Sequence, residues 1–242
     1  METRLNKLLA DLGYASRRAA DALIEAGRVT VNGRKAKLGE KVDPLQMEIQ
    51  LEGKKIQANK PEELEYWLFH KPVGVLSTLQ DPEGRRSLQK YIRTKTEARL
   101  FPVGRLDSDS EGLLLLTNDG ELAFRLTHPK YAVSKEYQVW VNGIFAQGKL
   151  ERLRRGVYLR EGKTAFDEVE IIEKTGRDFV LHVKIHEGKK REIRRVCAKV
   201  GWEVQRLQRQ RLAGLELGNL GAGQMRKLSA EELALLKHAV AL

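Results

Sequence analysis

Apolar and polar positions follow two different periods near the start of the chain. Four leucines between residues 5 and 12 recur at i, i+3, i+4 and i+7, which places them on one face of a short helix. Ser16 is suited to cap a second helix. Val29 and Val31 then alternate with polar residues before Asn32-Gly33, a dipeptide typical of a two-residue hairpin turn. The pattern predicts two helices followed by a small sheet.

From residue 66 onward, runs typical of strands are interleaved with runs of helical spacing. They are neither collected in one block nor arranged in strict strand–helix–strand order, which favours an α+β fold with a mixed sheet. Ser229 and Glu232 have the spacing of a capping box at the start of the last helix. The expected strands lie at 66–70, 113–117, 136–141, 168–173 and 179–185, and the expected helices at 121–126, 191–200 and 230–242.

A polar segment separates the two patterned regions. Residues 58–63, with the sequence ANKPEE, contain a proline and suit a linker. We therefore predict a small helix-helix-sheet domain over residues 1–58, a linker over 59–64 and a larger mixed-sheet domain over 65–242.

Composition narrows the class of protein. The 242 residues are 41% hydrophobic and carry a formal net charge of +11, as expected for a folded protein that binds a polyanion, although a merely basic surface remains an alternative. The single cysteine, Cys197, excludes an internal disulfide. The chain begins without a long apolar leader and has no apolar run of about 20 residues, the length that spans a bilayer. We expect a cytoplasmic monomer that is not bound to a membrane.

Positive charge is concentrated in two regions. Residues 184–211 contain ten Lys or Arg and three Asp or Glu, a net charge of +7. Near the N-terminus, basic residues line the two predicted helices and the turn region beyond them. Either group could contact RNA phosphates or form a solvated polar face. The basic residues of the N-terminal region are Lys7, Arg17, Arg18, Arg28 and Arg34.

Three acidic residues follow one another closely before the most apolar predicted strand. Asp107, Asp109 and Glu111 lie in FPVGRLDSDSEGLLLLTNDG, residues 101–120, but their spacing does not fit a calcium-binding EF-hand loop. The five histidines likewise lack the spacing of metal ligands. We expect no metal site. An aspartate in a glycine-containing loop is either a turn former or a carboxylate held at the end of a sheet for chemistry.

Resemblance to known families distinguishes these alternatives. The stretch RLNKLLADLGYASRRAADALIEAGRVTVNGRKAKLGEKV resembles the RNA-binding domain shared by ribosomal protein S-four and tyrosyl-tRNA synthetases. GRLDSDSEGLLLLTNDG resembles the catalytic signature of the RsuA/RluB family of ribosomal RNA pseudouridine synthases. The segments HKPVGVLST, SKEYQVWVNG and the region from His186 onward resemble the rest of that family in the same order.

The resemblance implies an isomerase that converts a uridine of ribosomal RNA to pseudouridine. The reaction breaks the N1–C1′ bond, turns the uracil and rejoins it through C5, so no redox cofactor is needed, and we expect none. A uridine inside a stem must first be flipped out. The RNA would be free or part of a pre-ribosomal particle, with 23S RNA favoured over 16S RNA. An RNA-binding ribosome-assembly factor without chemistry is the alternative.

The resemblance also implies roles for particular residues. Asp107 would be the catalytic carboxylate, and Arg194 would be the cation that pairs with it. Arg105 would fill the space left by the flipped nucleotide, Tyr137 would stack on the uracil, and Ile193 would line its pocket. The remaining expected RNA contacts are Lys189, Lys190, Arg191 and Arg195.

Overall fold

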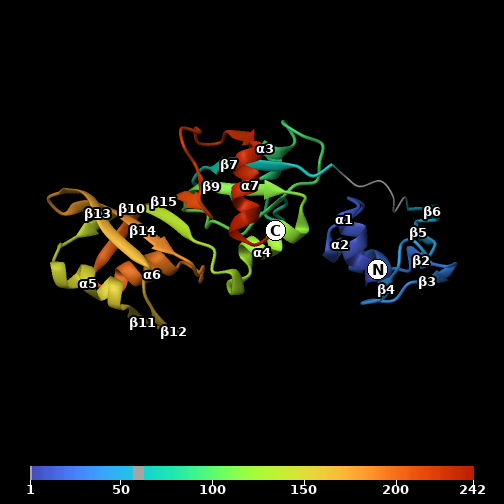
Figure 1. Cartoon of the computed structure of the whole chain (residues 1–242), viewed down its shortest axis with the longest axis horizontal. Coiled ribbons are helices and arrows are strands. Elements are labelled where there is room, and N and C mark those ends of the chain that lie inside the picture. Colours follow the sequence, from blue (N-terminus) through green and yellow to red (C-terminus); the bar gives the residue numbers. More distant parts are fainter. Residues whose placement is uncertain (1, 57–62) are drawn as a thin grey trace. The chain divides into compact units, whose positions relative to one another are not determined.

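The computed structural model describes residues 2–56 and 63–242, which form two compact units, Met1–Glu65 and Tyr66–Leu242 (Figure 1). Most of the predicted linker, residues 58–63, lies outside the described residues. Among the described residues, one hydrophobic core cluster lies in the first unit and three lie in the second. Among the described residues, none of the helices is long and apolar enough to cross a membrane.

The first unit has the predicted order of two helices followed by short strands. The Ser16 hydroxyl caps the second helix by accepting a hydrogen bond from the Ala19 amide at 3.1 Å. Asn32 and Gly33 have φ angles of 50° and 79°, which form the tight turn between two strands. The elements are β1 (Thr3–Arg4), α1 (Leu5–Asp11), α2 (Arg17–Glu25), β2 (Val29–Val31), β3 (Arg34–Lys35), β4 (Lys41–Val42), β5 (Ile49–Leu51) and β6 (Lys54–Lys55).

The second unit contains a mixed sheet whose strands run in the order β13-β14-β10-β15-β9-β7-β17. All of these neighbours are antiparallel except β15 and β9, so the α+β class with a mixed sheet is confirmed. The strands are β7 (Tyr66–Lys71), β8 (Phe101–Pro102), β9 (Glu111–Thr117), β10 (Lys135–Gly143), β11 (Val157–Leu159), β12 (Gly162–Thr164), β13 (Glu168–Thr175), β14 (Asp178–Ile185), β15 (Trp202–Leu212), β16 (Leu215–Glu216) and β17 (Met225–Lys227).

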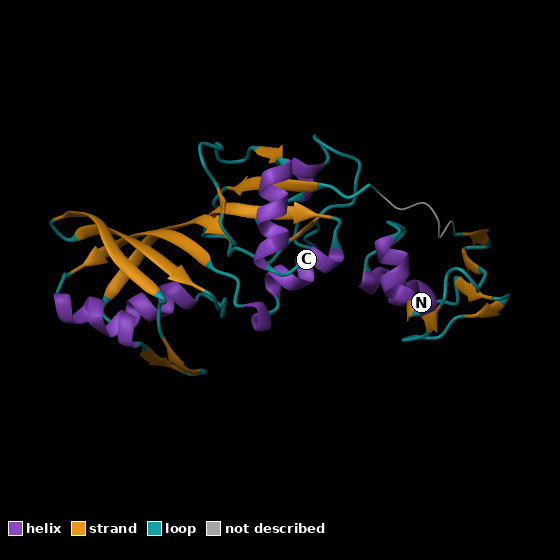
Figure 2. Cartoon of the chain, viewed as in Figure 1, coloured by secondary structure: helices purple, strands orange, loops and turns teal. Residues whose placement is uncertain are grey.

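The helices of this unit cover the two halves of the sheet separately (Figure 2). Helices α5 and α6 pack against β10, β13, β14 and β15. Strand β9 is buried on both faces, with Leu113 and Leu115 against α4 and α7, and Leu114 and Leu116 against α3. Its continuous run of leucines therefore reflects burial on both sides. The helices are α3 (Gln89–Ile92), α4 (Gly120–Thr127), η1 (Pro129–Tyr131), α5 (Gln147–Arg155), α6 (Glu192–Lys199) and α7 (Ala230–Ala239).

The two halves of the sheet meet at a very short parallel pairing. Only Gln208 with Glu111 and Arg209 with Gly112 are in register between β15 and β9. Gly112 has a φ of 105°, and a Cβ atom at this position would lie 2.3 Å from the Arg209 carbonyl oxygen. The close approach of the two strands therefore requires glycine here.

Replacing Gly112 with alanine should separate β9 from β15. The added methyl group has no space and the backbone conformation is unfavourable, so we expect Gly112→Ala to destabilise the protein by more than about 3 kcal/mol. Gly148→Ala is the control, because that helical position is open and the change should be neutral or stabilise by about 0.5–1 kcal/mol. Urea denaturation measures both. An equal midpoint for the two variants would contradict the close approach.

Candidate active site

The loop that carries Asp107 is held by the segment that follows β7. The Ser77 hydroxyl donates to the Leu106 carbonyl at 2.7 Å and accepts from the Leu106 amide at 3.0 Å. The Gly74 amide donates to the Ser108 carbonyl at 2.7 Å. Hydrogen bonds thus hold the backbones of both residues that flank Asp107, and they position its carboxylate without engaging it.

Asp107 lies on the wall of a cavity of about 420 Å³. Its side chain is 37% exposed and, among the described residues, it accepts no hydrogen bond, so the carboxylate is available to a ligand. Three of the four residues predicted to support Asp107 line the same cavity: Arg105 from the loop, Tyr137 from β10 and Ile193 from α6. Tyr137 and Ile193 are buried at 7% and 3% exposure. They give the cavity an apolar wall facing an ionisable group, an arrangement that suits a flat, partly polar ring.

The predicted pairing of Arg194 with Asp107 is wrong. The ion pair of Arg194 is with Asp109, at 3.3 Å from Nε, and its Nη atoms donate at 2.8 Å to the carbonyls of Asp109 and Val204. These contacts tie α6 and β15 to the loop. The physical reason is that the loop directs Asp109 toward α6, where the carboxylate and the carbonyl of Asp109 both bind the Arg194 guanidinium.

Arg191 is the cation closest to Asp107. It precedes α6 in a left-handed conformation with φ 52°, and its guanidinium lies 4.0 Å from the Asp107 carboxylate and 2.9 Å from that of Asp109. Partial burial by itself raises the pKa of Asp109, but the Arg191 hydrogen bond and the Arg194 charge outweigh it and hold that pKa below its usual value. The Asp109 carboxylate is therefore held by two arginines, whereas the nearby Asp107 carboxylate has only a 4.0 Å contact with Arg191.

Lys71 also lies in this region, although no sequence motif predicted it as a site residue. It ends β7, is 0% exposed, and donates from Nζ to the carbonyls of Ser110 at 2.7 Å and Pro72 at 3.0 Å. Burial lowers its pKa to about 8, while the charges of Asp107, Asp109 and Glu111 act in the opposite direction. The sequence did contain a signal for this residue. Lys71 ends the apolar run of a predicted strand, and a buried ammonium group needs hydrogen-bond acceptors in the interior.

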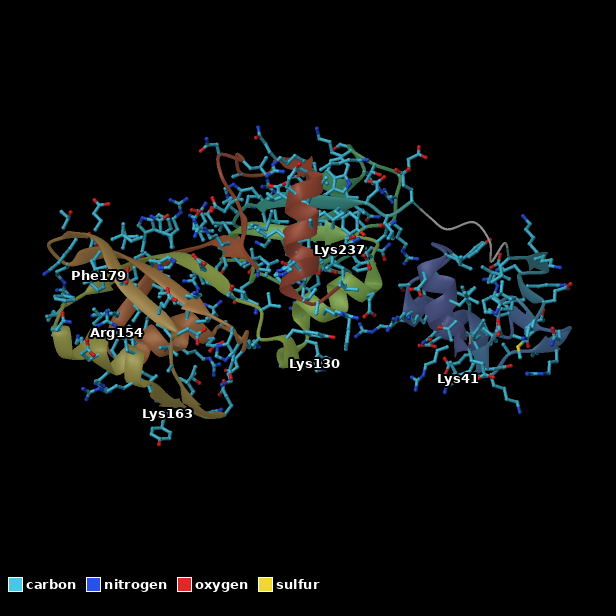
Figure 3. The ribbon with its side chains drawn as sticks, viewed as in Figure 1. Lys41, Lys130, Arg154, Lys163, Phe179 and Lys237 are labelled. Atoms are coloured by element: carbon cyan, nitrogen blue, oxygen red, sulfur yellow. The ribbon has the colours of Figure 1, made fainter. Side chains whose placement is uncertain are left out.

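The remaining predicted contacts of this unit lie around α6. Lys189 and Lys190 line the cavity, and Lys189 also forms an ion pair with Glu187. Arg195 does not line the cavity and instead pairs with Glu161 in the β11–β12 hairpin. Lys163, which Figure 3 labels, belongs to the same hairpin.

The five predicted contacts of the first unit are all exposed, but their surroundings differ. Arg28 pairs with Glu52 at 2.6 Å, Lys7 with Asp11 at 3.9 Å, and Arg34 with Glu40. Within the described part of the chain, Arg17 and Arg18 have no ion-pair partner. Of the five, only these two at the start of α2 have a charge that no carboxylate of the described residues pairs with.

The described side chains do not support a metal site or a reactive cysteine. Among residues 2–56 and 63–242, no group of three or more His, Cys, Asp or Glu side chains is arranged to hold a metal ion. Cys197 is fully buried, and burial raises the pKa of its thiol to about 12, so it is protonated near neutral pH. It serves as a core residue of α6.

Known proteins share both the sequence and the fold. The sequence pattern of the RNA pseudouridylate synthase family matches residues 65–199, and that of the S4 domain matches residues 3–48. An RNA pseudouridine synthase of Aquifex aeolicus is 41% identical, over 100% of this chain and 96% of its own length. The ribosomal large subunit pseudouridine synthase B of Bacillus subtilis is 40% identical, over 97% of this chain and 95% of its own.

A solved structure gives the same result. The crystal structure of a pseudouridylate synthase superimposes with a TM-score of 0.67 and 27% identity, and the match covers 96% of this chain and 99% of that one. The similarity therefore extends over nearly the whole chain. On its sequence, its fold and the cavity beside Asp107, this chain belongs to the RNA pseudouridylate synthase family.

Proposed function

We propose that the protein isomerises a specific uridine of ribosomal RNA to pseudouridine, with Asp107 as the catalytic carboxylate. The observation that carries the proposal is the position of Asp107. It is fixed through its neighbours' backbones, has no hydrogen bond on its carboxylate among the described residues, and faces the same cavity as Tyr137 and Ile193. A structural carboxylate would be expected to be bonded as Asp109 is.

The cavity has the features that the isomerisation requires. The N1–C1′ bond breaks, the uracil turns, a C5–C1′ bond forms, and a proton leaves C5 while N1 gains one, so no atom is lost. Tyr137 supplies a face for the ring, and base stacking on an aromatic residue contributes roughly 1–3 kcal/mol. Asp107 acts at the reacting ribose or base as nucleophile or proton acceptor. Arg191, at 4.0 Å, keeps a positive charge beside it when RNA excludes water.

The relatives support the choice of RNA. Ribosomal large subunit pseudouridine synthases from Bacillus subtilis and Vibrio cholerae are 40% and 38% identical to this chain. We therefore favour 23S RNA over 16S RNA as the substrate. Arg105 is exposed at the cavity wall, where it can occupy the gap left by the flipped nucleotide. The protein acts as a cytoplasmic monomer in this proposal.

The S4-like unit contributes affinity in this proposal. It contains no part of the cavity, all of whose lining residues lie in the second unit. The accessible cations at the start of α2 suit contacts with the RNA backbone, which position a protein on RNA without reading its bases.

Replacing the Asp107 carboxylate by an amide tests the proposed chemistry. Asp107→Asn keeps the shape of the side chain but removes its negative charge, so we expect pseudouridine formation to fall by at least about 10³-fold with RNA affinity largely retained. Mapping of pseudouridine in rRNA treated with the purified protein measures this. Asp178→Asn, on β14 and outside the cavity, is the control and should retain activity. Undiminished pseudouridine formation by Asp107→Asn would contradict the role of Asp107, whereas no pseudouridine from the unmodified protein would favour the alternative of an RNA-binding assembly factor without chemistry.

A stability comparison tests the different roles of Asp107 and Asp109. Asp109 pairs with two arginines, so Asp109→Ala should lower the free energy of unfolding by about 1–2 kcal/mol, a range that allows for screening at a half-exposed site. Asp107→Ala should change it by less than about 0.5 kcal/mol. Chemical denaturation decides between them, and the reverse order of the two values would contradict the assignment.

The contribution of the first unit can be measured through salt dependence. We expect Arg17→Gln with Arg18→Gln to weaken binding to rRNA and to reduce the slope of log affinity against log salt by about 1–2, because each lost phosphate contact removes about 0.7–0.9. Lys54→Gln with Lys55→Gln makes the same charge change on β6 and should have a smaller effect. Equal effects of the two pairs would show that only net charge matters.

A further inference from the structure

A second cavity adjoins the first in the same unit. It has a volume of about 520 Å³, and Arg105, Tyr137, Gly188 and Lys189 line both cavities. We call it the flanking cavity. Lys130, which Figure 3 labels, belongs to the short η1 helix at its border, where His128 and Pro129 form part of the wall. The proposed site for the uridine occupies only the first of these two hollows.

Arg209 lines the flanking cavity and is not fully bonded. It lies on β15 directly opposite Tyr137 of β10, is 2% exposed, and donates from Nε to the Leu113 carbonyl at 2.7 Å. Its Nη2 atom is buried with no hydrogen-bond partner, and within the described residues it has no carboxylate partner. Because an unpaired buried cation is costly, a guanidinium in this state indicates a missing anionic or polar ligand.

Lys135 adds a second, partly buried cation to the same wall. Its Nζ donates to the carbonyls of Val133 and His186, both at 2.9 Å, which leaves one of its three donors unused by these contacts. Burial lowers its pKa to about 8, and the Arg209 charge acts in the same direction. Among the described residues that line the cavity, the only carboxylate is that of Glu187, and it is already paired with Lys189. The flanking cavity therefore has a surplus of positive charge.

The apolar part of the wall strengthens any ion pair formed there. Leu126, Val133 and Leu212 are buried and line the cavity beside the cations. Surroundings of this kind lower the effective dielectric, which makes a charge-assisted hydrogen bond stronger than in water. A compact anion with several acceptor oxygens would be bound better here than on the solvated surface.

We infer that the flanking cavity binds one phosphodiester group of the RNA strand, next to the flipped uridine, with Arg209 and Lys135 as its donors. This inference rests on the proposed function. Tyr137 and Arg105 form the wall shared by the two cavities, so a nucleotide whose base enters the first has its backbone beside the second. The phosphate supplies the acceptor that Nη2 of Arg209 lacks, and holding it fixes the uridine relative to Asp107.

The test neutralises one RNA phosphate at a time. Fragments of rRNA that the full-length protein binds are made with a single methylphosphonate at each linkage in turn, and their affinities for the protein are measured. We expect one linkage beside the uridine to weaken binding about tenfold when neutralised. We expect Arg209→Gln to weaken binding of the unmodified RNA by a similar factor, to reduce the salt slope by about 1, and to be insensitive to that methylphosphonate.

Two further variants keep the test decisive. Lys135→Gln should show a reduced response to the same methylphosphonate, and it covers the case in which Arg209→Gln does not fold. Arg211→Gln is the matched control. Arg211 lies on the same strand but is exposed and paired with Glu216 at 2.6 Å, so its replacement should leave the response unchanged.

Three outcomes would overturn the inference. One is that no single linkage matters more than the others to the unmodified protein. Another is that Arg209→Gln and Lys135→Gln remain as sensitive to the critical linkage as the unmodified protein, which would mean that a water molecule satisfies Arg209. The third is saturable binding of inorganic phosphate, lost in Arg209→Gln, without any methylphosphonate effect, which would make this a site for a free anion. All of these measurements are affinities. A protein that binds the phosphate in this way but forms no pseudouridine would therefore contradict the proposed function and leave this inference intact.

Discussion

The close contact between Gly112 of β9 and Arg209 of β15 is the constraint on which the site depends. It joins an antiparallel half of the sheet to a second half through two residue pairs. The loop that carries Asp107 leads directly into β9, while Tyr137 and Ile193 belong to the other half. The Asp107 carboxylate and the apolar surface of Tyr137 and Ile193 therefore line one cavity because two strands approach more closely than any side chain at position 112 would allow.

The charges around this junction have different roles because their surroundings differ. Asp109 is bonded by Arg191 and Arg194, and this pairing ties α6 to the loop. Asp107, two residues earlier, has only a distant contact with Arg191 and remains available. The interior cations Lys71 and Arg209 are held by backbone carbonyls. Among the described residues, the site thus leaves the Asp107 carboxylate and several hydrogen-bond donors without a hydrogen-bond partner, as expected where function outweighs stability.

Local signals in the sequence predicted much of this architecture. The Ser16 cap, the Asn32-Gly33 turn and the leucine run of β9 depend on neighbouring residues, and each was confirmed. Strand β15 was not predicted, because its arginines and glutamines resemble a basic surface, and its conformation is imposed by pairing with β10 and β9. The family resemblance, and not local signals, led to the prediction that Asp107, Tyr137 and Ile193 share one site. The sequence could not show that Arg194 binds Asp109, because that choice depends on the direction of each carboxylate in the folded loop.

A structure of the protein bound to its RNA would test the central claim most directly. In a crystal of the Asp107→Asn variant with an rRNA fragment, the account predicts a flipped uridine whose ring lies on Tyr137. Its C1′ atom should lie about 3–3.5 Å from the side chain of residue 107, the separation of a reactive arrangement. A target uridine that remains stacked in the RNA, or that is bound away from this cavity, would contradict it.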